Sequence, residues 1–256
     1  MLKRWFAFIY GVACYAVFFV TFLYAIGFVG NIGVPRSIDS EPTGDFRTSL
    51  GIDLALLALF AVQHSGMARK GFKRWLTRFI AEPIERSTYV LASSAALIVL
   101  FAFWQPLGGV MWSVEDPFAI GLLHALCAFG WLTVLGTSFL INHFDLFGLR
   151  QVWLFAASKP YRAIDFRTPG PYRLIRHPLY FGFILAFWST PTMTVAHLVF
   201  ALATTGYILI AIQLEERDLV ANLGEAYRAY RRRVPMIVPF TGDRDVPGIA
   251  DEHITM

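Results

Sequence analysis

Four long stretches of this 256-residue chain contain no lysine or arginine, and this spacing limits the possible folds more than any other feature. They cover residues 5–35, 48–68, 87–149 and 177–216, and aliphatic and aromatic side chains dominate them. Charged residues make up 16% of the chain, where a soluble domain carries about a quarter. Each stretch can cross a bilayer core about 30 Å thick, so the sequence predicts an all-α integral membrane protein.

We expect four transmembrane helices followed by a C-terminal helical hairpin, giving five to six membrane segments in a single domain over residues 1–256. Residues 1–149 would form the transmembrane bundle and residues 150–240 a ligand-binding part that contains the hairpin. Residues 241–256 are polar and would form a flexible tail. The four expected spans are residues 5–30, 50–67, 88–105 and 118–142.

Twenty of the 22 basic residues would lie on one side of the membrane in this arrangement, and only Arg36 and Arg47 on the other. Basic residues favour the cytoplasmic side, so we expect both termini in the cytoplasm. The net charge of +4 is then explained by topology and by contact with membrane lipids, and no motif indicates nucleic acid as a partner. The basic segments are residues 3–4, 69–86, 150–176 and 217–244.

The last apolar stretch, 177–216, has 40 residues, or about 60 Å of helix, which is enough for two crossings. Pro191 is expected to divide it into a first arm of about 20 Å and a second of about 37 Å. The first arm is too short to span alone, so either the turn lies in mid-bilayer or this arm begins below the interface. Both alternatives predict a cavity that opens to the cytoplasm near His177.

Residues 170–182, GPYRLIRHPLYFG, carry the most specific signal in the chain. Proline suits the first position of a helix, so Pro178 would start one and His177 would be its N-cap residue. The free N–H groups of that helix end, with Arg176 beside them, would form a site for a carboxylate or phosphate.

Aromatic and small residues accompany this helix start. Tyr172 and Tyr180 could pack against a flat ring or a cation. Gly182, one turn after the proline, would let a ligand or a second helix approach closely. The alternative is that the arginines contact headgroups and the tyrosines belong to an interfacial aromatic belt.

A second polar segment, 213–239, would contain the end of a helix that runs from about residue 195 to 222. Gly224 is expected to stop that helix in a left-handed conformation. A short amphipathic helix would follow, with Tyr227 and Arg231 on one face. Neighbouring arginines would contact lipid headgroups.

Glu215 and Glu216 stand where the second arm leaves the membrane. Salt bridging with nearby arginines would explain them structurally. A carboxylate at this depth could equally hold ribose hydroxyls or an ammonium group. Together, the two segments offer donors for a carboxylate, acceptors for an ammonium group and a sugar, and aromatic surface for an onium centre, which is the chemistry that S-adenosylmethionine requires.

Residues 176–182, RHPLYFG, followed by residues 215–239, EERDLVANLGEAYRAYRRRVPMIVP, resemble the cofactor-binding half of the isoprenylcysteine carboxyl methyltransferase and phospholipid methyltransferase superfamily. The resemblance covers roughly the last third of the chain. It implies an integral membrane enzyme with S-adenosylmethionine as its cofactor. The residues that it places around the cofactor are His177, Tyr180, Gly182, Glu215 and Glu216.

The segments 62–73, 138–153 and 190–201 are similar to the NnrU-like branch of this superfamily. That resemblance implies a bacterial inner-membrane enzyme, with its active site toward the cytoplasm, that methylates methanethiol to dimethyl sulfide and leaves S-adenosylhomocysteine. Other acceptors stay open, namely another thiol, a prenylcysteine carboxylate or a lipid amine, as does a non-enzymatic channel or accessory role. A lipid-binding tunnel is not assumed, and the oligomeric state and entry route are not indicated.

His64, His143 and His177 are expected at the same cytoplasmic level, and Asp145 follows His143 by two residues. Ionisable residues inside a membrane are expensive and suggest function. A thiol with a pKa near 8.5 needs a base at neutral pH, because the thiolate is the nucleophile. Our hypothesis is that His143, aided by Asp145 or His64, takes the thiol proton.

The same three residues, His64, His143 and Asp145, could instead bind a metal ion. No His-x-x-x-His repeat supports that interpretation, so we favour the base and expect no metal site. Cys14 and Cys127 lack Cys-x-x-Cys spacing and are interpreted as packing residues. His197, toward the opposite side of the membrane, is interpreted as structural.

Overall fold

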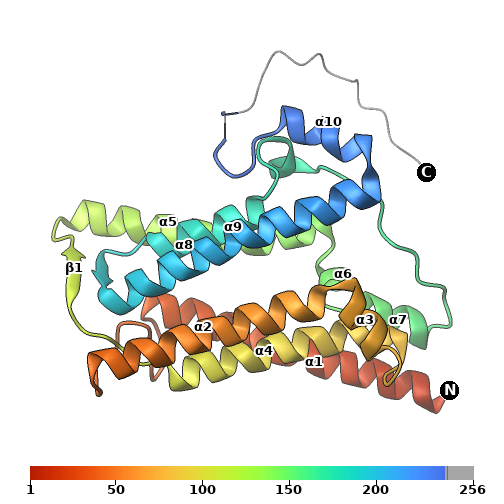
Figure 1. The fold of residues 1–256 in the computed structure, drawn as a ribbon, viewed down its shortest axis with the longest axis horizontal. Coiled ribbons are helices and arrows are strands. Elements are labelled where there is room, and N and C mark those ends of the chain that lie inside the picture. The colour runs from red at the N-terminus through yellow and green to blue at the C-terminus, as the bar shows by residue number, and fades with distance from the viewer. Residues whose placement is uncertain (240, 242–256) are drawn as a thin grey trace.

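The computed structural model describes residues 1–239 and Thr241, which form helices running alongside one another and a short two-stranded ribbon (Figure 1). Five helices are long and apolar enough to cross a membrane, so the predicted all-α membrane fold is confirmed. The predicted flexible tail lies outside the described residues, apart from Thr241. The helices are α1 (Leu2–Gly30), α2 (Phe46–Ala68), α3 (Lys70–Leu76), η1 (Glu82–Ile84), α4 (Glu85–Phe103), α5 (Pro117–Ile141), α6 (His143–Leu146), α7 (Leu149–Ala156), η2 (Gly170–Arg173), α8 (Pro178–Trp188), α9 (Val195–Leu223) and α10 (Glu225–Arg233), and the strands are β1 (Val110–Ser113) and β2 (Thr192–Thr194).

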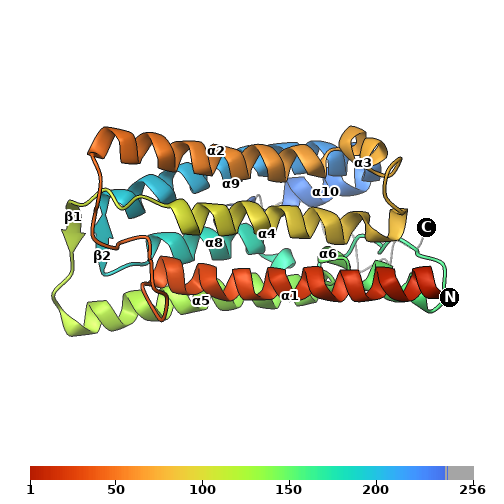
Figure 2. The ribbon, with the colours of Figure 1, turned by 90° about the horizontal axis from the view of Figure 1, so that it is seen from below.

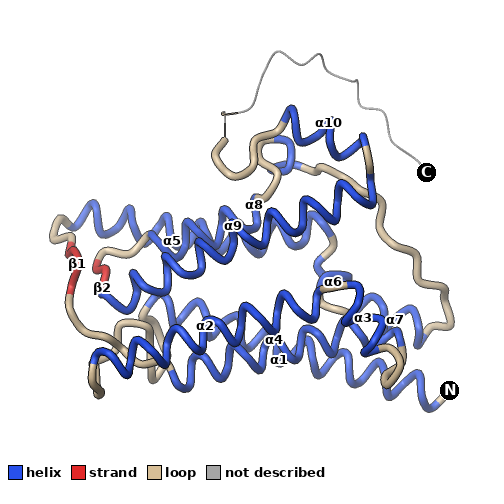
Figure 3. The backbone as a smooth tube through the Cα atoms, in the orientation of Figure 1, coloured by secondary structure: helices blue, strands red, loops and turns tan. Residues whose placement is uncertain are grey.

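The long helices form two groups that lie side by side (Figures 1 and 2). Helix α4 packs against α1 and α2 in one group, and α8 packs against α5 and α9 in the other, while α2 also contacts α9. Figure 3 shows the two strands at one end of the molecule, which we call the ribbon end. The short helices α3, α6, α7 and α10 lie at the other end, which we call the basic end because most arginines and lysines gather there.

The hairpin of α8 and α9 has the unequal arms that the sequence predicts, with 11 residues in α8 and 29 in α9. Strand β2, which joins the arms, pairs antiparallel with β1, so the turn lies at the ribbon end. A helix as short as α8 cannot reach from there to the basic end. The sequence left two alternatives, a turn in mid-bilayer or a first arm that begins below the interface. The position of the turn favours the second, in which α8 begins inside the bundle.

An aromatic core near the ribbon end joins the two groups of helices. Phe28 of α1 packs against Phe101 and Trp104 of α4 and against Phe200 of α9, with ring centroids 4.9 to 6.5 Å apart. Phe187 of α8 meets Phe200 at 5.0 Å. All five are buried, and burial of each such side chain stabilises the fold by about 1.5–3 kcal/mol. This core fixes α8 and α9 against α1 and α4.

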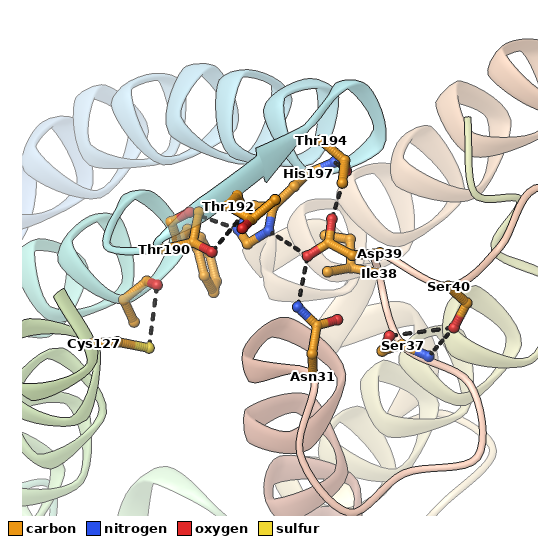
Figure 4. Close-up of polar contacts among 12 residues, drawn as sticks. Asn31, Ser37, Ile38, Asp39, Ser40, Cys127, Thr190, Thr192, Thr194 and His197 are labelled. Carbon is orange, nitrogen blue, oxygen red and sulfur yellow. Dashed lines mark hydrogen bonds and ion pairs between the residues drawn. The ribbon is translucent and has the colours of Figure 1, made fainter. Parts of the chain in front are cut away.

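A polar cluster fastens the loop after α1 to the hairpin turn (Figure 4). His197 is fully buried, and its Nδ1 lies 3.1 Å from Oδ2 of Asp39, while its Nε2 lies 2.9 Å from the carbonyl oxygen of Phe187. Both ring nitrogens lie at hydrogen-bonding distance from oxygen atoms, which fixes the orientation of the ring. Thr194 and Asn31 also donate to Asp39. The structural interpretation of His197 is confirmed.

Replacing Asp39 with asparagine should lower the free energy of unfolding by about 3 kcal/mol at neutral pH, because it removes a mostly buried carboxylate that accepts hydrogen bonds from Asn31 and Thr194 and faces His197. Burial opposes ionisation of Asp39, but the bonds from His197, Thr194 and Asn31 outweigh it and hold its pKa below the ordinary 3.8. The carboxylate thus stabilises the fold fully above pH ~4 and loses this effect as pH falls through the lowered pKa. Thermal denaturation of both proteins in detergent should show a difference that shrinks in acid; a constant difference would contradict the assignment.

Candidate active site

Helix α8 begins as the sequence predicts. His177 is its N-cap residue, with extended φ of −126°, and Pro178 is the first helical residue. Proline lacks an N–H group and its fixed φ suits this position, so the chain turns into the helix here. Phe181 is the first residue whose N–H bonds back, to the carbonyl of His177. The N–H groups of Leu179 and Tyr180 lie outside the helical ladder, at the positive end of the helix dipole.

The buried carboxylate of Glu216 joins the α8 start to α9. Its Oε1 accepts from Nε of Arg176 at 2.7 Å and lies 3.1 Å from Nε2 of His177. Its Oε2 lies 3.5 Å from Nε of Arg231. The side chains of Glu216, Arg176 and His177 are 5%, 10% and 6% exposed, so the carboxylate and the guanidinium neutralise each other out of water. We call Arg176, His177 and Glu216 the ion cluster.

Backbone bonds also join the two segments that the sequence singled out. The N–H of Arg176 donates to the carbonyl of Pro235 at 2.9 Å, and the N–H of His177 to that of Met236 at 3.1 Å. The hydroxyl of Tyr230 donates to the carbonyl of Tyr172 at 2.6 Å. Segments 40 to 60 residues apart in sequence therefore meet at one site.

Glu215, next to the ion cluster, has a different environment. Its side chain is exposed, and Oε2 accepts a hydrogen bond from the hydroxyl of Tyr180 at 3.0 Å. Tyr172 lies nearby, and burial together with the negative charge of Glu215 raises the pKa of its phenol. Burial and the charge of Glu216 likewise raise the pKa of Tyr227 on α10. The phenols therefore stay neutral, and the carboxylate of Glu215 can still accept hydrogen bonds from a ligand.

Gly182 faces a neighbouring helix. A Cβ atom there would lie 2.7 Å from the carbonyl oxygen of Gly130 and 2.9 Å from a methyl carbon of Val134, both on α5. Gly130 meets α8 equally closely. Of the two roles that the sequence left open for Gly182, close approach of a second helix is the one observed.

Alanine at Gly182 should therefore cost about 1–3 kcal/mol of folding free energy, because α5 and α8 must move apart. Gly136, also on α5, is the matched control, since a Cβ atom there meets nothing within 4 Å. Alanine at Gly136 should be neutral or slightly stabilising, because alanine favours helix. Thermal stability in detergent checks both, and equal effects at the two positions would contradict this packing role.

His64 lies within a hydroxyl network between α2, α4 and α9. Its Nε2 is 2.9 Å from the hydroxyl of Tyr89, its Nδ1 is 3.1 Å from that of Ser93, and its ring stacks on Phe60. Ser65, next to His64 in sequence, lies 3.0 Å from the hydroxyl of Tyr207 on α9. His64 therefore lies where α2 meets α9, the helix that carries Glu215.

His143 occupies a separate place, between α1 and the end of α5. Its Nε2 lies 2.8 Å from the hydroxyl of Tyr15 and its Nδ1 2.8 Å from that of Ser138. Phe139 stacks on the ring at 4.1 Å, and only 2% of the residue is exposed. Burial lowers its pKa, so the ring is neutral. A substrate could reach this ring only by displacing a phenylalanine.

Asp145 pairs with Arg150 at 2.8 Å and accepts from the hydroxyl of Tyr161 at 3.3 Å. Within the described residues, no hydrogen bond joins His143 to Asp145 or to His64. The same part of the chain contains no group of three His, Cys, Asp or Glu side chains that could hold a metal ion. The three predicted catalytic residues thus occupy three separate networks.

Sequence reasoning missed Tyr89, Ser93 and Tyr207. Tyr89 and Ser93 stand four residues apart on one face of α4, a spanning helix that also contains Ser87, Thr88 and Ser94. Polar side chains at helical spacing inside a span were the signal that could have identified this network.

Comparison with known proteins adds a family to this geometry. A family model described as a protein of unknown function (DUF1295) matches residues 70–234. A methanethiol S-methyltransferase of Crocosphaera subtropica is 55% identical over 243 residues, covering 95% of each chain. A methanethiol S-methyltransferase of Mycobacterium tuberculosis is 53% identical over 239 residues, covering 93% of this chain and 98% of the relative. Nurim of Xenopus laevis is 31% identical over 182 residues, covering 68% of this chain and 63% of the relative. No solved structure matches the chain.

Proposed function

Because the chain belongs to the methanethiol S-methyltransferase family, we propose that it transfers a methyl group from S-adenosylmethionine to methanethiol, giving dimethyl sulfide and S-adenosylhomocysteine. The observation that carries this proposal is the meeting of segments 170–182 and 213–239 around Glu215 and Glu216. A chain whose relatives are named as methyltransferases needs a donor site, and this junction offers one.

The residues at the junction fit that donor. The exposed carboxylate of Glu215 would accept from ribose hydroxyls or an ammonium group, with Tyr180 keeping it oriented. Arg231 is half-exposed and lies 3.5 Å from Glu216. Together with the free N–H groups at the start of α8, it would donate hydrogen bonds to the carboxylate of S-adenosylmethionine. The ring of Tyr172 would pack against the adenine or the sulfonium centre.

The ion cluster would act indirectly on this site. Arg176, His177 and Glu216 satisfy one another, so their role is to fix the α8 start and α10 in place rather than to exchange partners with a ligand. Tyr227, a buried residue of α10, supports the same junction. The sequence predicted that His177 and Glu216 bind the cofactor. In this proposal they instead position the start of α8 and α10 around it.

The donor, when bound, supplies a methyl group already activated by a positive sulfonium sulfur. The protein must then exclude water and remove the proton of the thiol. We propose His64 as the base, since its partners Tyr89 and Ser93 are hydroxyls that can donate to the neutral ring and accept from the protonated one. Its place where α2 meets α9, the helix that carries Glu215, favours it over His143, whose ring is enclosed by phenylalanines.

We also propose that the basic end faces the cytoplasm of a bacterial inner membrane, where S-adenosylmethionine is made. The concentration of lysine and arginine at that end supports this orientation. Cysteines introduced singly at Arg78 and Arg47 would test it: a membrane-impermeant thiol reagent on intact cells should label only the cysteine at position 47.

The activity itself is tested by headspace detection of dimethyl sulfide from membranes that contain the full chain, given methanethiol and S-adenosylmethionine. Formation above membranes without the protein is the expected result. Binding of S-adenosylmethionine without dimethyl sulfide would point to another thiol, a carboxylate or a lipid amine as acceptor. Absence of binding by calorimetry would favour a non-enzymatic accessory role.

A further inference from the structure

A concavity of about 390 Å³ lies at the corner between α9 and α10, at the basic end. Val220 of α9 and Arg228, Arg231 and Arg232 of α10 line it. Figure 1 shows α10 folded back over the end of α9, and Gly224, with φ of 60°, makes the turn that creates this corner. The concavity is thus a product of the fold and not of one flexible side chain.

The three guanidinium groups around it have more charge than their acidic neighbours balance. Arg232 lies 2.7 Å and Arg228 3.5 Å from the carboxylate of Glu225, which they share. Arg231 lies 3.5 Å from Glu216, whose charge is already opposed by the buried Arg176. The arginine side chains are 50% to 58% exposed, so donors of each group remain available to an oxyanion within this part of the structure.

The position of the concavity selects the kind of anion. Helix α9 is long and apolar enough to span the membrane, and the arginines follow its end, which is where we expect lipid headgroups. Guanidinium groups bind phosphate through paired hydrogen bonds, and each basic side chain near a membrane surface attracts anionic lipid. Val220 gives the concavity an apolar wall, which suits the glycerol part of a lipid better than a free ion.

We propose that this concavity binds the headgroup phosphate of an anionic phospholipid, held chiefly by Arg228 and Arg232. The bound lipid adds a fixed negative charge beside Arg231 and so helps to hold α10 in place. This site adjoins the proposed site of the methyl donor at Arg231, but Arg228 and Arg232 take no part in binding the donor.

Native mass spectrometry tests the proposal on the full chain released from nanodiscs of phosphatidylcholine and phosphatidylglycerol. The wild-type protein should retain phosphatidylglycerol in preference, and a double Arg228→Gln and Arg232→Gln variant should lose this preference about tenfold. The matched control is a double Arg74→Gln and Arg78→Gln variant, with the same spacing and charge change in exposed positions of the same end. It should retain the lipid as the wild type does.

If both double variants lost the preference for phosphatidylglycerol equally, the proposed site would be wrong, because general surface charge would then explain the lipid binding. Inorganic phosphate, titrated into the nanodiscs of phosphatidylcholine and phosphatidylglycerol, distinguishes the source of the phosphate group. Saturable binding of phosphate that displaces phosphatidylglycerol would assign the concavity to a soluble anion and overturn the lipid. Dimethyl sulfide formation by the Arg228 and Arg232 variant in phosphatidylcholine should equal that of the wild type, which separates this test from that of the proposed function.

Discussion

Replacement of His64 by glutamine is expected to slow dimethyl sulfide formation by about 10²–10⁴-fold, the usual effect of removing a general base. Glutamine can still bond to Tyr89 and Ser93, so the hydroxyl network and the fold should survive. Binding of S-adenosylmethionine should be nearly unchanged, because His64 makes no contact with Glu215 or the ion cluster. Initial rates by headspace chromatography and donor affinity by calorimetry provide the two measurements.

His143 supplies the comparison, because it too is neutral and bonded to two hydroxyls. Glutamine at His143 should leave turnover within a few-fold of wild type and act mainly on stability, since the ring fills a closed space between α1 and α5. If this variant stayed folded and lost turnover while the His64 variant kept it, the base would be His143. Phenylalanine at Tyr89 should shift the pH at which turnover is half-maximal without removing it, as a positioning residue would.

Replacement of Glu215 by glutamine is expected to weaken binding of S-adenosylmethionine by about 10–100-fold, because hydrogen bonds to a charged group contribute about 1.5–3 kcal/mol. The side chain is exposed and bonded to Tyr180, which glutamine can also accept from, so thermal stability should hardly change. Turnover at saturating donor should largely recover. Calorimetry and a donor titration of the rate measure the two effects.

Glutamine at the adjacent Glu216 should produce the opposite pattern. It leaves the buried charge of Arg176 without a carboxylate, which costs about 3–5 kcal/mol of folding free energy. The variant should melt at a lower temperature, and any loss of donor binding should follow that instability. If the Glu215 and Glu216 variants had identical effects on stability and on donor binding, the two glutamates would share one role. That result would contradict the assignment of binding to Glu215 and positioning to Glu216.

Much of the fold is readable from the chain because its strongest signals are local. The absence of Lys and Arg over long stretches marks the spans to within a few residues, and α9 ends one residue after the predicted 222. His177 and Pro178 start α8 because of steric restrictions that involve only neighbouring residues. Gly224 has the positive φ predicted for it, although with ψ of −129° it is not in the left-handed helical conformation.

The parts that escaped prediction depend on how distant segments meet. The pairing of β1 with β2 follows from where the two helix groups end, which three or four residues of strand cannot encode. The spans predict a shared level in the membrane for His64 and His143, but the rotation of each helix about its axis decides what each ring touches. The sequence grouped His64, His143 and Asp145 by their expected depth in the membrane. The rotation of their helices places the three side chains in separate hydrogen-bond networks.

The bonds from Arg176 and His177 to Pro235 and Met236 have a consequence for how the protein is made. A ribosome releases residue 176 well before residue 236, so α8 enters the membrane while the backbone N–H groups of Arg176 and His177 lack their final acceptors. Only after the last spanning helix has inserted and the chain has doubled back can those two N–H groups be paired. Biogenesis should therefore halt at a recognisable stage in any chain cut short before residue 236, with the long helices inserted and the short one still open to degradation.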